Sequence, residues 1–109
     1  MQQYDKAVVI YSTFPTLETA EAAGSALVAA KLAACVNILP GMVSIYVWQG
    51  ERHRDAETVM LIKTRAALAD AAIAEAKQLH PYSNPAFLIL PVEGGAEPFL
   101  QWIMAQTQT

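Results

Sequence analysis

Two side chains in this sequence belong to the types that bind transition metals: the single cysteine, Cys35, and one of the two histidines, His80. A cysteine thiolate is a soft ligand that prefers Cu(I), and a neutral imidazole binds copper and other divalent ions. The second histidine, His53, lies in the charged segment GERHRD and is expected to be a solvated loop residue. We therefore predict Cys35 and His80 as the candidate metal ligands.

Both residues also have a purely structural interpretation. Cys35 stands where a helix is expected to meet a strand, and a buried cysteine packs there as a small hydrophobic side chain. His80 follows a helix, whose C-terminal dipole favours a cation, so it could cap that helix. Because a tight transition-metal site uses three or four N or S ligands, a site within one subunit would be weak or completed by other subunits.

Charged and aromatic residues form a second group whose spacing could serve binding. Glu57 and Lys63 are separated by six residues of an expected strand, so their side chains share a face. Charges that bracket an apolar strand are more often solubilising groups or interface ion pairs than catalytic groups. Tyr46 and Trp48 could stack on a planar ligand, but interface packing explains aromatic residues on a strand equally well.

The segments that position these residues alternate between strand and helix patterns. Runs rich in β-branched and aromatic residues predict strands, and apolar residues at three- and four-residue steps predict helices. Thr16 is expected to cap the first helix, and Pro98 to stand at the first position of the last. Strands are predicted over 6–13, 34–48 with a kink at 40–41, 57–64 and 86–93, and helices over 17–33, 66–79 and 99–105.

This order predicts an α+β chain with the ferredoxin-like split βαβ arrangement, βαββαβ plus a C-terminal helix, and a long central hairpin. Two helices can cover only one face of the sheet. The hairpin is nevertheless apolar on both faces, with Val43, Ile45 and Val47 on one side and Tyr46 and Trp48 on the other. Each such side chain left in water forfeits roughly 1.5–3 kcal/mol, so we predict that copies of the chain cover it as a homo-oligomer.

Length and composition narrow the function classes. The 109 residues fit a single domain, 1–109, and a net charge of −3 argues against nucleic acid as a partner. The apolar runs are too short for a membrane span, which needs about 18 residues. The N-terminal segment lacks the pattern of a signal peptide, and a single cysteine forms no internal disulfide, so we expect a cytoplasmic protein.

Several spaced motifs occur together in one order: KLAACVNILPG from position 31, WQG at 48–50, Lys63-Thr64, and HPY at 80–82. Through them the chain resembles the CutA family of divalent-ion tolerance proteins over nearly its whole length. The resemblance implies a ferredoxin-like fold, a homotrimer built by sheet extension between subunits, residence in the bacterial cytoplasm, and an association with copper and other divalent ions. It implies no catalytic turnover.

The same resemblance implies a cleft between subunits. In the family, the residues that match Glu57 and Lys63 belong to this cleft beside the HPY turn, so we predict that it is formed by Trp48, Glu57, Lys63 and Tyr82, next to His80. The family trimer resembles that of the PII signalling proteins, which bind nucleotides between subunits. The alternative function is therefore a PII-like sensor that holds a small anionic ligand or nucleotide.

Two further features bear on metal binding and on catalysis. Some family members carry another cysteine and another histidine where this sequence has Ser12 and Leu79, which leaves the preferred metal open. Acylphosphatases share the split βαβ topology but use an arginine in the loop after the first strand. Residues 12–16 contain no arginine, so the sequence predicts no such enzyme.

Overall fold

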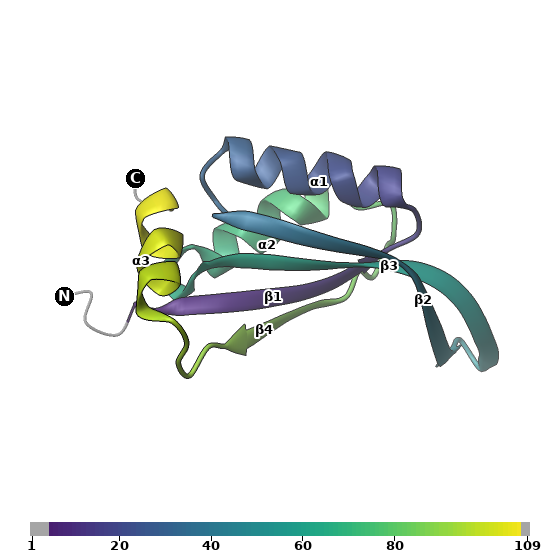
Figure 1. Ribbon diagram of the computed structural model, residues 1–109. Coiled ribbons are helices and arrows are strands. Elements are labelled where there is room, and N and C mark those ends of the chain that lie inside the picture. Colours follow the sequence, from purple (N-terminus) through teal and green to yellow (C-terminus); the bar gives the residue numbers. More distant parts are fainter. Residues whose placement is uncertain (1–4, 108–109) are drawn as a thin grey trace.

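The computed structural model describes residues 5–107 and confirms the ferredoxin-like α+β architecture (Figure 1). All four strands pair antiparallel in one sheet, in the order β2-β3-β1-β4. In chain order the elements are β1 (Ala7–Phe14), α1 (Leu17–Ala29), β2 (Cys35–Trp48), β3 (Glu51–Arg65), the 3-10 turn η1 (Ala66–Leu68), α2 (Ala69–Gln78), β4 (Phe87–Pro91) and α3 (Glu97–Gln106).

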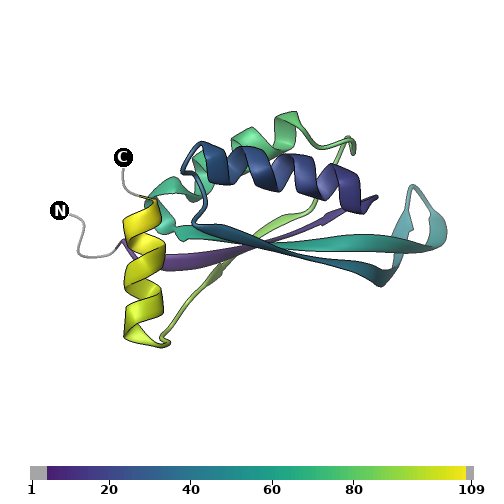
Figure 2. The ribbon, with the colours of Figure 1, turned by 45° about the horizontal axis from the view of Figure 1, so that its top comes forward.

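Helices α1 and α2 lie over the same face of the sheet, and α3 crosses one end of it (Figures 1 and 2). The main core lies between the two helices and the sheet. Ile10, Met60 and Ile62 of the sheet are fully buried there against α1, including Leu27. Gly24 brings α1 close to β2, because a Cβ atom at this position would lie 2.8 Å from Cγ2 of Val36.

The other face of the sheet, which α1 and α2 do not cover, is called the open face below. Strand alternation and the observed register place these residues on it: Val9, Tyr11, Cys35, Asn37, Leu39, Val59, Leu61, Lys63, Leu88 and Leu90. Leu39, Leu88 and Leu90 are 50%, 58% and 46% exposed. Among the described elements, α3 reaches this face at one end, where Nζ of Lys63 lies 5.3 Å from the centre of the Phe99 ring.

Strands β2 and β3 form the long central hairpin, which extends past α1 (Figure 1). The predicted kink at 40–41 is present as a shift in register between Leu39 and Met42, and Gly41 has a φ of 86°. At the tip, Gln49 and Gly50 have φ values of 53° and 82°. Two consecutive residues with positive φ are typical of a type I′ turn, whose twist matches that of the flanking strands.

The predicted start of the return strand at position 57 is wrong. β3 begins at Glu51, because residues 51–56 pair with residues 43–48 of β2 up to the turn. The charged sequence of this segment lacks the apolar alternation that marks a half-buried strand. His53 is consequently a strand residue opposite Tyr46, and its ring stacks on the Tyr46 ring with 5.1 Å between centroids.

Helix α1 begins as predicted and ends earlier than predicted. Oγ1 of Thr16 accepts a hydrogen bond of 3.1 Å from the backbone N–H of Thr19, so Thr16 is the N-cap. The predicted end at position 33 is wrong, because Lys31 adopts a φ of 61° and the Leu32 N–H bonds the Leu27 carbonyl at 2.9 Å. This is the Schellman arrangement that terminates many helices, here without a glycine to mark it in the sequence.

Candidate functional site

A pocket of about 670 Å³ lies where the hairpin leaves the body of the sheet. Its walls come from β1, β2, β3 and the loop after α2. Four aromatic residues, Tyr11, Tyr46, Trp48 and Tyr82, contribute to the lining, together with polar side chains that include Ser44 and Glu57. An aromatic pocket with a few convergent polar groups is the usual form of a small-ligand site.

The carboxylate of Glu57 is held by two hydroxyl groups in the wall of this pocket. Oγ of Ser44 donates to Oε1 at 2.6 Å, and the phenol of Tyr82 donates to Oε2 at 2.7 Å. Burial, and then the hydrogen bond to Glu57, raise the pKa of Tyr82 well above its ordinary value, so the phenol keeps its proton and remains a donor. The network fixes one carboxylate at the pocket wall.

A second carboxylate, that of Asp55, is bonded to one of the aromatic residues that line the pocket. The phenol of Tyr46 donates a hydrogen bond of 2.5 Å to Oδ2 of Asp55, on the neighbouring strand. This hydrogen bond is the main cause that raises the pKa of Tyr46. The two phenols of the pocket that bond carboxylates are therefore neutral donors, and they leave the negative charges of Glu57 and Asp55 in place.

The predicted cleft residues Trp48, Glu57 and Tyr82 meet in this pocket, but Lys63 does not. Lys63 is six residues along β3 from Glu57, which is roughly 20 Å in an extended strand. Its ammonium group lies over the ring of Phe99 instead. Within one subunit, the pocket thus gathers three of the four predicted residues.

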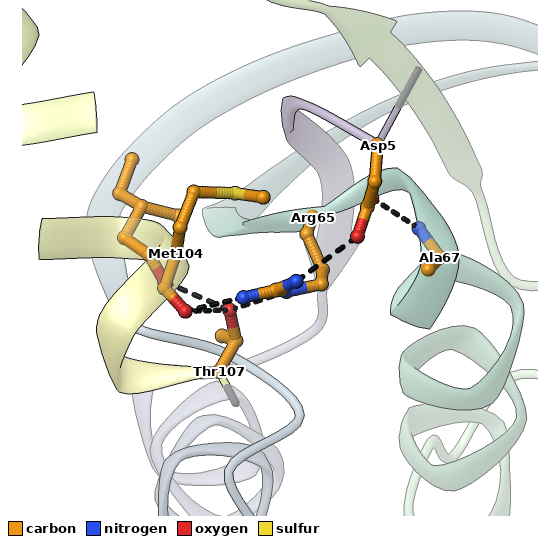
Figure 3. A network of polar contacts seen from close by, with 6 residues as sticks. Asp5, Arg65, Ala67, Met104 and Thr107 are labelled. Carbon is orange, nitrogen blue, oxygen red and sulfur yellow. Dashed lines mark hydrogen bonds and ion pairs between the residues drawn. The ribbon is translucent and has the colours of Figure 1, made fainter. Parts of the chain in front are cut away.

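Arg65, another basic residue of β3, is bound in a structural network near the chain ends (Figure 3). Its guanidinium donates to Oδ2 of Asp5 at 3.0 Å, to Oγ1 of Thr107 at 3.0 Å, and to the backbone carbonyl of Met104. Asp5 also accepts a hydrogen bond of 2.9 Å from the N–H of Ala67. Arg65 therefore connects α3 and the start of β1, and takes no part in the pocket.

His80 is buried beside the pocket, with both ring nitrogens in hydrogen bonds. Nε2 lies 2.7 Å from the Thr13 carbonyl, and Nδ1 lies 3.1 Å from the N–H of Tyr82, so the neutral ring donates through Nε2 and accepts through Nδ1. The ring stacks on Phe14 at 4.1 Å. Burial lowers the pKa of His80, and its ring nitrogens bond Thr13 and Tyr82, so the described contacts favour a neutral ring over a cationic helix cap.

The described geometry gives His80 a positioning role, because its ring holds the backbone of Tyr82, whose phenol in turn holds Glu57. A metal could bind His80 only if one of the two ring hydrogen bonds broke.

Cys35 lies at a different end of the sheet from His80. It is half-buried on the open face, where it pairs with Lys63, which in turn pairs with Val9. Thr13, the partner of His80, is four residues farther along β1. Thr13 is thus displaced from Cys35 by roughly 13 Å along the strands and by roughly 10 Å, two strand spacings, across them. The two predicted ligands therefore do not meet within one subunit.

Residues 5–107 contain no group of three or more His, Cys, Asp and Glu residues placed to hold a metal ion. The donor set of one subunit therefore does not fit a tight site, and the metal-binding roles of Cys35 and His80 stay predictions that require ligands from other subunits.

Ser44 and Tyr11 line the pocket but were not predicted from the sequence. Ser44, Tyr46 and Trp48 occupy every second position of β2, so strand alternation alone places their side chains on one face. Tyr11 reaches the pocket through the pairing of β1 with β3, opposite Leu61. Such a contact depends on strand order, which a single strand pattern does not show.

The comparison with known protein families identifies the family of the chain. Residues 8–106 match the family model of the CutA1 divalent ion tolerance protein. The chain belongs to the CutA1 family. Among curated relatives, the divalent-cation tolerance protein CutA of Pectobacterium atrosepticum is 41% identical over 99 residues, which are 91% of this chain and 90% of that protein.

A chloroplastic CutA 1 of rice is 40% identical over 101 residues, which are 93% of this chain and 57% of the rice protein. The chain therefore spans little more than half of this plant relative. The crystal structure of CutA from Xylella fastidiosa is 41% identical and superposes with a TM-score of 0.92, over 94% of this chain and 99% of that one. In the part of the chain that the structure describes, no helix is long and apolar enough to cross a membrane.

Proposed function

We propose that this CutA1-family chain is a divalent-ion tolerance protein that binds copper or another divalent cation without catalytic turnover, as a homotrimer in the cytoplasm. The match to the CutA1 family over residues 8–106 is the observation that carries the divalent-ion part of the proposal. The relative of Pectobacterium atrosepticum is named a divalent-cation tolerance protein, and it aligns with this chain over most of both lengths.

The exposed apolar surface supports the homotrimer. On one side of the hairpin, Val43, Ile45 and Val47 are 47%, 61% and 69% exposed. The open face adds further apolar side chains next to the hairpin. A monomer rarely tolerates a continuous apolar surface of this extent, and neighbouring copies of the chain would bury it.

A trimer would also supply the metal ligands that one subunit lacks. Cys35 lies on the open face, the surface that the proposed assembly covers, so cysteines or other donors of several subunits could be combined there. A soft thiolate favours Cu(I) over hard divalent ions. Copper binding is therefore expected to depend on Cys35 and on the assembled trimer.

The test is a Cu(I) competition titration of the wild type and of Cys35→Ser, with His53→Gln as the control variant. We expect Cys35→Ser to lower the affinity at least tenfold and His53→Gln to leave it unchanged. Serine is close in size to cysteine, and the mass in solution reports whether the assembly is kept. Equal affinities of the wild type and Cys35→Ser would exclude Cys35 as a ligand.

The pocket beside Glu57 supports a second function, a PII-like trimer that senses a small molecule. Its volume of about 670 Å³ and its aromatic lining suit a compact organic ligand. Thermal-shift measurements test this function, since a ligand that binds only the folded protein must raise the melting temperature. No shift with any charged or neutral probe would contradict it.

The hydrogen bonds around the pocket support the non-catalytic proposal. A hydrolytic site would need a nucleophile next to a free general base. The histidine that borders the pocket, His80, has both ring nitrogens in hydrogen bonds, and the hydroxyls of Ser44 and Tyr82 both donate to Glu57. These groups hold one another in place and leave none of the three free to act as a base.

A further inference from the structure

The charge of the pocket beside Glu57 is opposite to the charge that an anion site requires. Glu57 is the one formally charged residue among the described pocket-lining residues, and Asp55 accepts the hydrogen bond of Tyr46, which also lines the pocket. No Lys, Arg or His lines the pocket within residues 5–107, and no cation of this range lies within 4.0 Å of the Glu57 carboxylate. An anionic ligand would meet a carboxylate here, and no cation among the described pocket-lining residues offsets the repulsion.

The Glu57 carboxylate is oriented but not saturated. Each of its oxygens accepts one hydrogen bond, from Ser44 or from Tyr82, and a carboxylate oxygen can accept two. Both donors are neutral hydroxyls, so neither supplies a counter-ion for the negative charge. A charged N–H donor would add a strong hydrogen bond and would also neutralise Glu57.

The aromatic residues of the pocket add a second attraction for a cation. Trp48, Tyr46, Tyr82 and Tyr11 line the same cavity as Glu57, and the ring of Tyr46 also stacks on His53. The face of an aromatic ring attracts ammonium and guanidinium groups within about 6 Å, most strongly for tryptophan. The rings also offer an apolar surface to the hydrocarbon part of a ligand.

We propose that the pocket formed by Glu57, Ser44, Tyr82 and the rings of Tyr46 and Trp48 binds a small organic cation, an alkylammonium or alkylguanidinium group with an apolar body. The carboxylate accepts the charged N–H groups, and the aromatic walls contact the rest of the ligand. The organic cation is thereby the ligand class of the second function, the small-molecule sensor, and the inference rests on that function. It requires no metal ion.

The test uses three probes of similar size: phenethylammonium as the cation, 2-phenylethanol as the neutral analogue and 3-phenylpropionate as the anion. Binding is measured by tryptophan fluorescence of the full chain in EDTA. Trp48 and Trp102 are the two tryptophans, so a Trp102→Phe background makes Trp48 the reporter. We expect saturable binding of the cation, with the alcohol and the carboxylate at least tenfold weaker.

Glu57→Gln keeps the shape of the side chain and removes its charge, and we expect it to abolish the preference for the cation. Glu21→Gln makes the same charge change at an exposed position of α1, on the helical side of the sheet, and should leave binding unchanged. The comparison of the three probes on the Trp102→Phe background alone keeps the test informative if Glu57→Gln does not fold.

Three outcomes would overturn the proposal: preferential binding of 3-phenylpropionate, equal binding of all three probes, or no binding of any probe. Preference for the anion would instead support the anionic-ligand alternative, with a cation from a neighbouring subunit in the pocket. Because the titration contains EDTA, its result is independent of copper binding. Equal binding of all three probes would refute the ligand class alone, whereas the absence of any binding would refute the sensor function as well.

Discussion

Replacing Arg65 by methionine is expected to destabilise the protein strongly, because the Arg65 network connects segments that are far apart in the sequence. The ion pair with Asp5 has an N–O distance of 3.0 Å, and the two side chains are 16% and 4% exposed. Removing one partner of a buried ion pair costs about 3–5 kcal/mol. Asp5 would keep its hydrogen bond from the Ala67 N–H, so we expect the lower end, about 3 kcal/mol.

For a domain of this size, that loss corresponds to a decrease in melting temperature of roughly 15 °C. The assay is urea unfolding followed by circular dichroism, at one fixed protein concentration because oligomerisation contributes to stability. Lys6→Met is the matched control, since its pair with Glu93 spans 3.9 Å between side chains that are 54% and 85% exposed. We expect that control to cost less than about 1 kcal/mol. Equal losses for both variants would refute the structural role of Arg65.

Two further substitutions test the core and the histidine beside the pocket. Gly24→Ala is expected to destabilise the protein by about 1–3 kcal/mol, because the new Cβ would lie 2.8 Å from Val36 Cγ2. This loss should exceed the gain from the better helix propensity of alanine. Unfolding titrations should show no such loss for the control variant Ser25→Ala. Burial lowers the pKa of His80 below 6.5, so the unfolded chain binds more protons and stability should fall as pH drops below about 6.5. His80→Phe should flatten this acid dependence, whereas an unchanged slope would contradict it.

Most of the fold follows from local sequence patterns. The β-branched runs, the Thr16 cap and the Pro40-Gly41 break each have a direct physical signal, and the structure contains the corresponding elements. The sequence could not predict that β3 begins at Glu51, because the polar segment after the turn is held by pairing with β2 instead of by burial. Likewise, the end of α1 depends on Lys31 in a conformation that usually favours glycine.

The candidate site was predictable only where residues share one strand face or one turn. Trp48, Glu57 and Tyr82 do meet, because the register of β2 with β3 and the loop after α2 bring them to one pocket. Lys63 shares a strand face with Glu57, but strand length separates the two. The separation of Cys35 from His80 depends on strand order, which no local pattern encodes.

The most direct test of the assembly is the mass of the protein in solution at micromolar concentration, measured by light scattering or sedimentation equilibrium. If neighbouring copies cover the open face and the hairpin, the particle should have three times the 11.8 kDa mass of the chain. It should keep that mass on dilution, because the apolar surface would become exposed if the subunits separated. A stable, folded particle of 11.8 kDa would contradict the proposed homotrimer and any metal site shared between its subunits.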